Sequence, residues 1–210
     1  MPRLRALALA AAAAPLTIAF VAPAPVVAQA DRGLAMVQAH LRAVDTMTAR
    51  FTQTDRRGRT LNGTLSMKRP GKVRFDYGRD ANMLIVGDGR ALTFVDYEVG
   101  QRQRWPINDS PLSVLLNPDQ DLARFSRVTR NDDQVVLLEA RDPRRREFGT
   151  ITIAFAKVPG APAGLMLQGW NTRDAQNNLT TVRLSNQRFN VPVADSAFRY
   201  QNPRPRGPRG

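Results

Sequence analysis

The chain has 210 residues, enough for one domain, and carries 31 Lys and Arg against 18 Asp and Glu, a formal net charge of +13. It contains no cysteine, which excludes disulfides, thiolate metal sites, a cysteine nucleophile and a lipid-modified N-terminal cysteine. The excess of positive charge favours anionic membrane surfaces, acidic partners or nucleic acid as binding partners.

Residues 1–30 have the composition of a secretory signal peptide. Arg3 and Arg5 give a basic start, residues 6–21 are apolar, and small residues at 28–30 predict cleavage between Ala30 and Asp31. An uncleaved membrane anchor is the alternative, but the apolar run is short for a bilayer and contains Pro15. We therefore expect an exported protein whose fold begins at Asp31.

Residues 31–47 have helical spacing. Leu34, Val37, Leu41 and Val44 recur at intervals of three and four, which predicts an amphipathic helix with an apolar stripe. The stripe needs a cover from the rest of the fold. His40, the only histidine, lies beside the stripe, and we expect it at the surface.

From residue 48 onward the hydrophobic period changes to two, as in strands. Turn signals follow at Gly58, at Pro70–Gly71 and at Gly87–Gly89. Many short strands at this spacing favour an antiparallel barrel or sandwich. The expected strands are 48–53, 61–69, 72–77, 83–86, 92–95, 101–105, 125–130, 135–140, 150–155, 165–172 and 179–184.

Residues 108–118 interrupt the strands with a short, very apolar helix. Ser110 can cap it, Pro111 suits its first position, and Asn117 with Pro118 ends it. Such a segment is either a core-filling connector or a flap over something apolar. At the far end of the chain, residues 203–210 are rich in Pro and Arg and predict a disordered basic tail.

One arginine falls on the apolar side of its predicted strand. Side chains alternate along a strand, so Arg69 shares the face of Leu65 and Met67. A desolvated guanidinium needs hydrogen-bond acceptors. The alternative is that the alternation slips at the turn and leaves Arg69 in solvent.

The sequence offers no catalytic constellation. A single histidine with no better-placed base cannot build a triad, and the carboxylates cluster at turns, where Asp is ordinary. Zinc, phosphate-loop and dinucleotide motifs are absent, so we expect no enzyme, no cofactor and no metal. Nucleic acid is disfavoured because the strands lack the repeated exposed aromatics of stacking platforms.

Four segments resemble the periplasmic outer-membrane lipoprotein carriers of the LolA family. They are FTQ at 51–53, GTLSMKRPGKVRFDY at 63–77, LIVGDGRALTFVD at 84–96 and DSPLSVLLNP at 109–118. The resemblance implies a mainly β fold with a few helices (α+β). Its incomplete, strongly curved antiparallel β-barrel has an N-terminal helix and short lid helices that cover a hydrophobic cavity. It weakens after about Ala140, where only the strand pattern persists.

The resemblance also implies site residues. Arg69 would be a latch that holds the lid closed, and the last-turn carbonyls at 114–117 are the acceptors we expect for it. Between the two faces of strand 92–95, the face with Phe94 is expected to point inward. The expected acyl-chain cavity consists of Leu41, Val44, Phe51, Leu65, Met67, Phe75, Val86 and Phe94. The expected lid side chains are Leu112, Leu115 and Leu116.

The function implied is that of a periplasmic chaperone, a monomer whose carrier domain spans residues 31–202. Its partners would be the acyl chains of lipoproteins, an inner-membrane ATP-driven transporter that releases them, and an outer-membrane receptor or the outer membrane itself. Two alternatives stay open: a carrier of another lipid or apolar ligand, and a combined carrier and outer-membrane acceptor. Ser66 and Phe75 stand where relatives often carry tryptophan, so the cavity can differ in shape.

Overall fold

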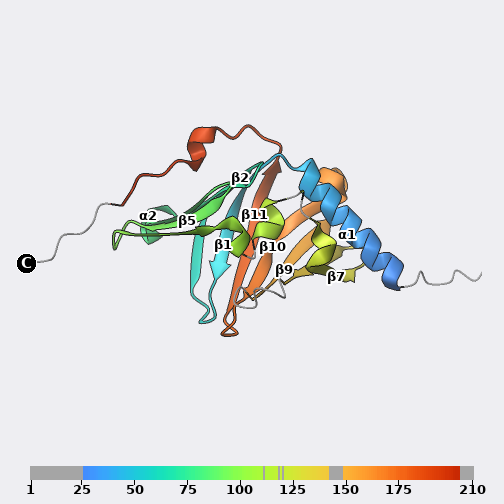
Figure 1. Cartoon of the computed structure of the whole chain (residues 1–210). Helices are drawn as coiled ribbons and strands as arrows, with labels where there is room; N and C mark the ends of the chain where they lie inside the picture. Colours follow the sequence, from blue (N-terminus) through green and yellow to red (C-terminus); the bar gives the residue numbers. More distant parts are fainter. Residues whose placement is uncertain (1–25, 111, 118, 120, 142–148, 204–210) are drawn as a thin grey trace, which may run out of the picture.

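A single curled antiparallel sheet forms the body of the molecule (Figure 1). The computed structural model describes residues 26–110, 112–117, 119, 121–141 and 149–203. The eleven strands within these residues follow the order β6-β5-β4-β3-β2-β1-β11-β10-β9-β8-β7. Their bounds are β1 Thr46–Thr54, β2 Thr60–Lys68, β3 Lys72–Asp76, β4 Met83–Asp88, β5 Ala91–Asp96, β6 Gln101–Pro106, β7 Ser126–Asn131, β8 Val135–Ala140, β9 Thr150–Lys157, β10 Leu165–Arg173 and β11 Leu179–Phe189.

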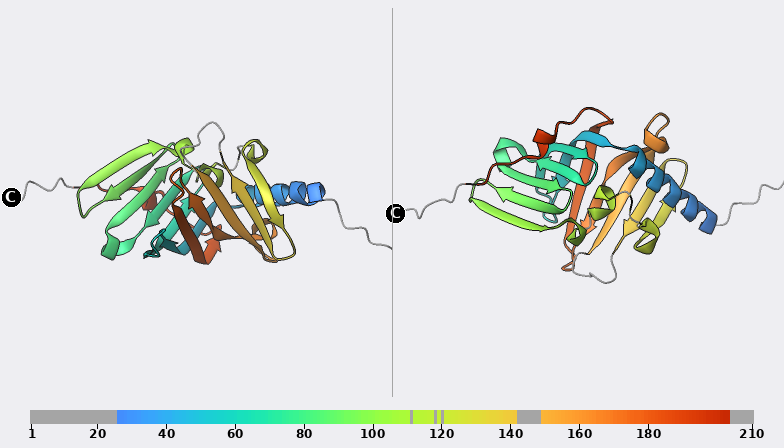
Figure 2. Two further views of the ribbon diagram at one scale, coloured as in Figure 1. Left: turned by 90° about the horizontal axis from the view of Figure 1, so that it is seen from below. Right: turned by 45° about the horizontal axis from the view of Figure 1, so that its top comes forward.

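The helices lie mainly on the concave side of the sheet. Helix α1 (Val26–Ala43) runs along the half made of β7 to β10, and the one-turn helix α3 (Ser113–Leu116) enters the middle (Figures 1 and 2). No helix in the described residues is both long and apolar enough to span a bilayer. The short elements are α2 Gly78–Ala81, η1 Ile107–Asp109, η2 Leu122–Arg124, η4 Pro162–Gly164 and η5 Asp195–Phe198.

The sheet consists of two antiparallel meanders joined where β1 pairs with β11. Irregular register between Thr48 and Arg50, and again between Leu167 and Gly169, adds local bends to the ordinary strand twist. The sheet curls, but its edge strands β6 and β7 do not pair with each other. The expected mainly β fold, an incomplete and strongly curved antiparallel barrel with an N-terminal helix, is confirmed.

Alternation along the strands separates a buried concave face from a polar convex face. In β1, for example, Met47, Ala49 and Phe51 are buried, whereas Arg50 between them is exposed. Gly63 lies opposite Phe51 on β2, and a Cβ at Gly63 would lie 2.6 Å from the Phe51 ring. Glycine at this position therefore makes room for the largest buried side chain of β1.

The predicted strands are confirmed with small shifts of their ends, except that β11 continues to Phe189, well past the predicted end at residue 184. The first helix also differs from its prediction. It ends at Ala43 rather than at residue 47, because β1 already begins at Thr46. It also begins at Val26, before the predicted cleavage site, so that site stays a prediction. Most of the predicted signal peptide (1–25) and most of the predicted tail (204–210) lie outside the described residues.

Candidate functional site

Aromatic side chains form the floor of the concave face. The Phe51 ring meets Phe75 edge-to-face at a centroid distance of 5.5 Å and Tyr77 at 5.0 Å, and Phe75 meets Trp170 at 6.0 Å. All four are buried, as is Leu65 beside them on β2. Edge-to-face ring pairs stabilise the folded state beyond the effect of burying their apolar area. Buried Val182 and Leu184 of β11 lie between β1 and β10 in the same cluster. The floor is therefore a continuous apolar surface that crosses β10, β11, β1, β2 and β3.

One polar pair lies within this apolar floor. The Tyr77 hydroxyl donates a hydrogen bond to Gln53 Oε1 at 2.8 Å. Burial raises the pKa of Tyr77 to about 12, so the hydroxyl stays protonated and available as a donor. Gln53 lies on the inward face of β1, like Phe51. Its hydrogen bond with the Tyr77 hydroxyl explains why the strand tolerates a polar side chain there.

Helix α1 and helix α3 cover the floor. Leu41 of α1 is buried, and Val44 just beyond its end is half-buried against the same core. In α3, Leu115 and Leu116 are 6% and 5% exposed. Helix α3 therefore inserts its leucines into the core.

A small pocket marks where the lid meets the sheet. Its volume is about 30 Å³, room for about two water molecules and far less than an alkyl chain needs. It joins residues from the end of α1, from the β2–β3 corner and from α3. They are His40, Leu41, Val44, Asp45, Met47, Met67, Lys68, Arg69, Gly71, Lys72, Leu115, Leu116 and Leu167.

Arg69 lies at the rim of this pocket with its side chain 30% exposed. Its Nη1 donates to the carbonyl oxygen of Arg42 in the last turn of α1 at 2.7 Å. Ion pairs join it to Asp45 at 3.7 Å and to Asp119, just after the lid helix, at 3.6 Å. A single guanidinium therefore bridges α1, the start of β1 and the segment that follows α3.

The acceptors of Arg69 differ from those expected. The prediction placed them in the last turn of α3, at 114–117, but the hydrogen-bonded carbonyl belongs to α1. Strand β2 ends at Lys68, and the Arg69 backbone N–H bonds to the carbonyl of Asp45 at 2.8 Å, which holds the corner against the end of α1. The lid is reached through the Asp119 carboxylate instead.

Most of the other predicted cavity residues gather on the concave face. Leu41, Phe51, Leu65 and Phe75 are buried in the main core, and Val44 and Met67 are half-buried against it. Half-buried Phe94 lies opposite Ile85, which packs on that core, so the choice of the Phe94 face agrees with the register. The predicted lid residue Leu112 is also half-buried against the core.

Val86 is the exception, and its predicted place was wrong. It lies opposite Arg74, whereas its neighbour Ile85 lies opposite the buried Phe75. Val86 therefore faces the convex side, where it packs with Leu84, Val95 and Phe198 in a separate cluster. A strand apolar on both faces gave the sequence no alternation from which to choose the inward side.

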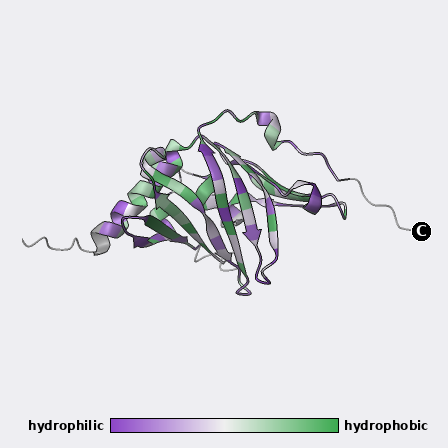
Figure 3. Cartoon of the chain, turned by 180° about the vertical axis from the view of Figure 1, so that it is seen from behind, coloured by the Kyte–Doolittle hydropathy of each residue, from purple (hydrophilic) through white to green (hydrophobic). Residues whose placement is uncertain are grey.

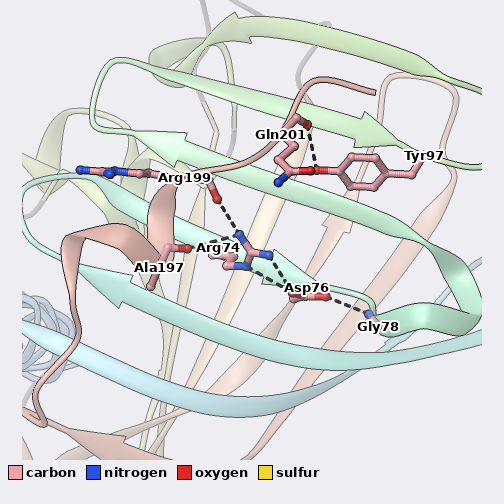
Figure 4. Close-up of polar contacts among 7 residues, drawn as sticks. All are labelled: Arg74, Asp76, Gly78, Tyr97, Ala197, Arg199 and Gln201. Atoms are coloured by element: carbon pink, nitrogen blue, oxygen red, sulfur yellow. Dashed lines mark hydrogen bonds and ion pairs between the residues drawn. The ribbon is translucent and has the colours of Figure 1, made fainter. Parts of the chain in front are cut away.

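The chain after β11 explains this second cluster. Residues 190–203, here called the C-terminal strap, cross the convex side of β3 to β5 (Figures 1 and 4). Arg74 donates to the carbonyls of Ala197 and Arg199 at 3.3 and 3.0 Å and is paired with Asp76 at 2.8 Å (Figure 4). Phe198 of the strap covers the apolar side chains of β4 and β5.

His40 is buried, which corrects the expectation of a surface residue. It is 2% exposed, Nδ1 lies 2.9 Å from the carbonyl oxygen of Pro162, and the ring meets Phe155 and Phe189 edge-to-face. Burial lowers the pKa of His40, while hydrogen bonds to the Pro162 and Leu165 backbone oppose that shift. The loop around Pro162 makes a flank of α1 into an interior position, which helical spacing alone does not reveal.

The described residues hold no group of three or more His, Asp or Glu side chains that could bind a metal. The concave face offers apolar surface, and α3 with its buried leucines covers the middle of it. Arg69 contacts both the end of α1 and the segment after α3.

Comparison with known proteins places this geometry in a family. A model of the family described as "Outer membrane lipoprotein carrier protein LolA" matches residues 42–201. A protein of Methylobacillus flagellatus named outer-membrane lipoprotein carrier protein is 27% identical over 91% of this chain and 94% of its own length. A protein of the same name from Actinobacillus succinogenes is 29% identical over 90% and 89%.

Among solved structures, an uncharacterized conserved protein from Thermus thermophilus has a similar fold. The TM-score is 0.50 at 11% identity, over 81% of this chain and 93% of that one. At this identity the likeness concerns the fold alone.

Proposed function

The chain belongs to the LolA family of outer-membrane lipoprotein carriers, and from that premise we propose that it carries lipoproteins through the periplasm by enclosing their acyl chains beneath α3. The observation that carries the proposal is the insertion of Leu115 and Leu116 into the apolar concave core. Acyl chains offer the same kind of surface as these leucines, so cargo and lid can occupy the same space in turn.

The energetics explain why a carrier is needed. Each methylene moved out of water contributes about 0.8 kcal/mol, so two or three long acyl chains represent on the order of tens of kcal/mol. Enclosing them in apolar surface offsets that cost. Release is still possible because the empty protein is not left with an exposed cavity: the lid leucines refill it, and the closed state competes with the loaded one.

Arg69 is the proposed latch of the closed state. It joins α1 to the segment after α3 by one charged hydrogen bond and two longer ion pairs. Opening α3 for cargo separates at least the Asp119 pair. The proposed cavity lining is the set Leu41, Val44, Phe51, Leu65, Met67, Phe75 and Phe94, with Leu112, Leu115 and Leu116 as the lid.

The proposed route begins at an ATP-driven transporter of the inner membrane and ends at a receptor of the outer membrane or at that membrane itself. The signal peptide predicted at residues 1–30 would bring the protein to the periplasm. The role is binding and hand-over, and no step of it requires the protein to make or break a covalent bond.

The test is transfer from a membrane. Proteoliposomes that hold a triacylated lipoprotein and its ATP-driven exporter are incubated with protein purified from the periplasm, and the supernatant is probed for lipoprotein. The expected result is a soluble one-to-one complex that forms only with ATP. If folded protein leaves all lipoprotein in the membrane, the cargo is not a lipoprotein, and lipids extracted from the native protein would identify it.

A further inference from the structure

The convex face of the sheet has an unusual charge pattern at its centre. The five described strands β2, β1, β11, β10 and β9 contain no aspartate or glutamate. The outward positions of three of them carry arginines: Arg50 on β1, Arg173 on β10, and Arg183 and Arg188 on β11. We call these four residues the arginine face.

The register brings the arginines onto the same side. Arg50 lies opposite Ser185, and Arg183 lies opposite Thr52, so the two are diagonal neighbours at about 7–8 Å between backbones. Arg188 lies opposite Thr48, and all four arginines are exposed. Figure 3 views the molecule from behind, where polar and apolar residues alternate along the strands.

Among the described residues, no carboxylate neutralises the charge of this face. No hydrogen bond or ion pair to another described residue involves the side chains of Arg50, Arg183 or Arg188. Within the part of the chain that the structure describes, the Arg173 side chain bonds only to the neutral Asn177 amide oxygen. Carboxylates at the end of β10 and on the flanking strands β8 and β3 have other partners. Asp174, which follows Arg173, accepts hydrogen bonds from Asn178, while Glu139 pairs with Arg127 and Asp76 with Arg74. An anionic partner would therefore meet three or four uncompensated charges.

An exposed leucine lies on the same face. Leu179 begins β11 directly opposite Arg173, on the outward side, and is 38% exposed. It is one of only two large apolar side chains so exposed in the described part of the chain, the other being Val99. Leu179 thus lies at one end of the arginine face, beside Arg173. A row of arginines with an apolar side chain at its end suits the headgroup layer of a bilayer, where the cations meet phosphate and the leucine reaches the acyl boundary.

We propose that the arginine face with Leu179 docks the protein reversibly on an anionic phospholipid membrane. The convex side would lie against the bilayer, which leaves α1 and α3 on the opposite side of the sheet, clear of the lipid. The purpose of docking rests on the proposed carrier function, because a carrier held at a membrane searches for its partners in two dimensions. The docking itself needs no cargo.

The test is co-sedimentation of protein purified from the periplasm with vesicles of phosphatidylcholine, with or without phosphatidylglycerol. Native protein is expected to bind the anionic vesicles and to be released by salt. Each arginine near an anionic surface contributes roughly fivefold in affinity, so the triple variant Arg50→Gln/Arg183→Gln/Arg188→Gln should bind about 100-fold more weakly. Leu179→Ser should weaken binding further.

A matched control distinguishes binding through the arginine face from a general effect of the protein's net charge. The triple variant Arg32→Gln/Arg79→Gln/Arg90→Gln removes three exposed charges on other elements and should keep most of the binding. Equal losses in the two triple variants would overturn the proposal. The proposal would also be overturned if native protein did not bind anionic vesicles, even if the arginine face bound an acidic protein instead. If the protein bound vesicles but took up no lipoprotein, the carrier function would be refuted and the docking proposal would stand.

Discussion

Replacing Arg69 with leucine removes the polar latch but keeps an apolar stem of similar length at the pocket rim. The lost contacts are a hydrogen bond of 2.7 Å from the guanidinium to the Arg42 carbonyl and two ion pairs of 3.6 and 3.7 Å. The substitution thus tests the closed state without opening a cavity in the core.

The expected magnitude follows from these contacts. A hydrogen bond from a charged group contributes about 1.5–3 kcal/mol, and the 30% exposure of Arg69 argues for the lower end. The carboxylates of Asp45 and Asp119 are 81% and 74% exposed, so the two ion pairs together add at most about 1 kcal/mol. Of these contacts, only the Asp119 pair joins Arg69 to the segment after α3, so its loss, at most about 1 kcal/mol, shifts the balance between closed and open lid by up to about fivefold. The Arg42 hydrogen bond instead holds the β2–β3 corner against the end of α1.

Hydrogen exchange measures that shift directly. The amides of Leu115, Leu116 and Asn117 bond to carbonyls within the lid segment and exchange when it opens. They should exchange up to about fivefold faster in Arg69→Leu, whereas sheet amides keep their rates. Asp119→Asn, which removes the same contact with the lid segment, should accelerate lid exchange to a similar extent. Unchanged lid exchange in Arg69→Leu, or equal acceleration throughout the sheet, would refute the latch.

Three further predictions concern the floor, the helix and the strap. Phe51→Ala should lower the free energy of unfolding by about 3–5 kcal/mol in urea titrations, because the buried ring contacts Phe75 and Tyr77; a loss below about 1 kcal/mol would contradict the packing. Burial lowers the pKa of His40, so the imidazole binds a proton less readily in the folded state than in the unfolded chain. The free energy of unfolding should therefore fall as the pH drops from 7 through the ordinary histidine range toward the lowered pKa. In His40→Gln, the midpoint of urea unfolding should depend less on pH over this range. If the variant and the native protein gave the same pH profile, His40 would not be the responsible group. Arg74→Met should release the strap and speed tryptic cleavage after Arg199, since Arg74 holds the Ala197 and Arg199 carbonyls; unchanged protection of Arg199 would show that Phe198 suffices.

Alternation made much of the concave face predictable. In β1 to β3 a polar residue follows each apolar one, so Phe51, Leu65 and Phe75 could be assigned to the inside from the sequence. The same rule failed in β4, where Met-Leu-Ile-Val is apolar throughout and the outward pair Leu84 and Val86 is covered by Phe198. That cover arrives from more than a hundred residues away, and no local pattern contains it.

Arg69 shows the other limit. Its unusual place beside apolar residues was visible in the sequence, but its acceptor was not. The partner depends on where β2 ends and on how the corner docks against α1, which is a tertiary contact between Arg69 and Asp45. For His40 the deciding element is likewise remote, the loop around Pro162. Helical spacing indicates which side of a helix is most apolar, but it does not show that another segment of the chain covers a neighbouring side.

The central claim is that lid and acyl chains compete for the same space, and a tethered lid tests it most directly. Met67 on β2 and Leu116 on α3 both line the small pocket, and the chain has no cysteine of its own. Met67→Cys with Leu116→Cys, joined by a bifunctional maleimide, would hold the lid down. The measurement is uptake of triacylated lipoprotein into a soluble complex, with the same double-cysteine variant before linking as the control. The tethered protein should take up none while the unlinked variant takes up lipoprotein; equal uptake by the two would contradict the claim.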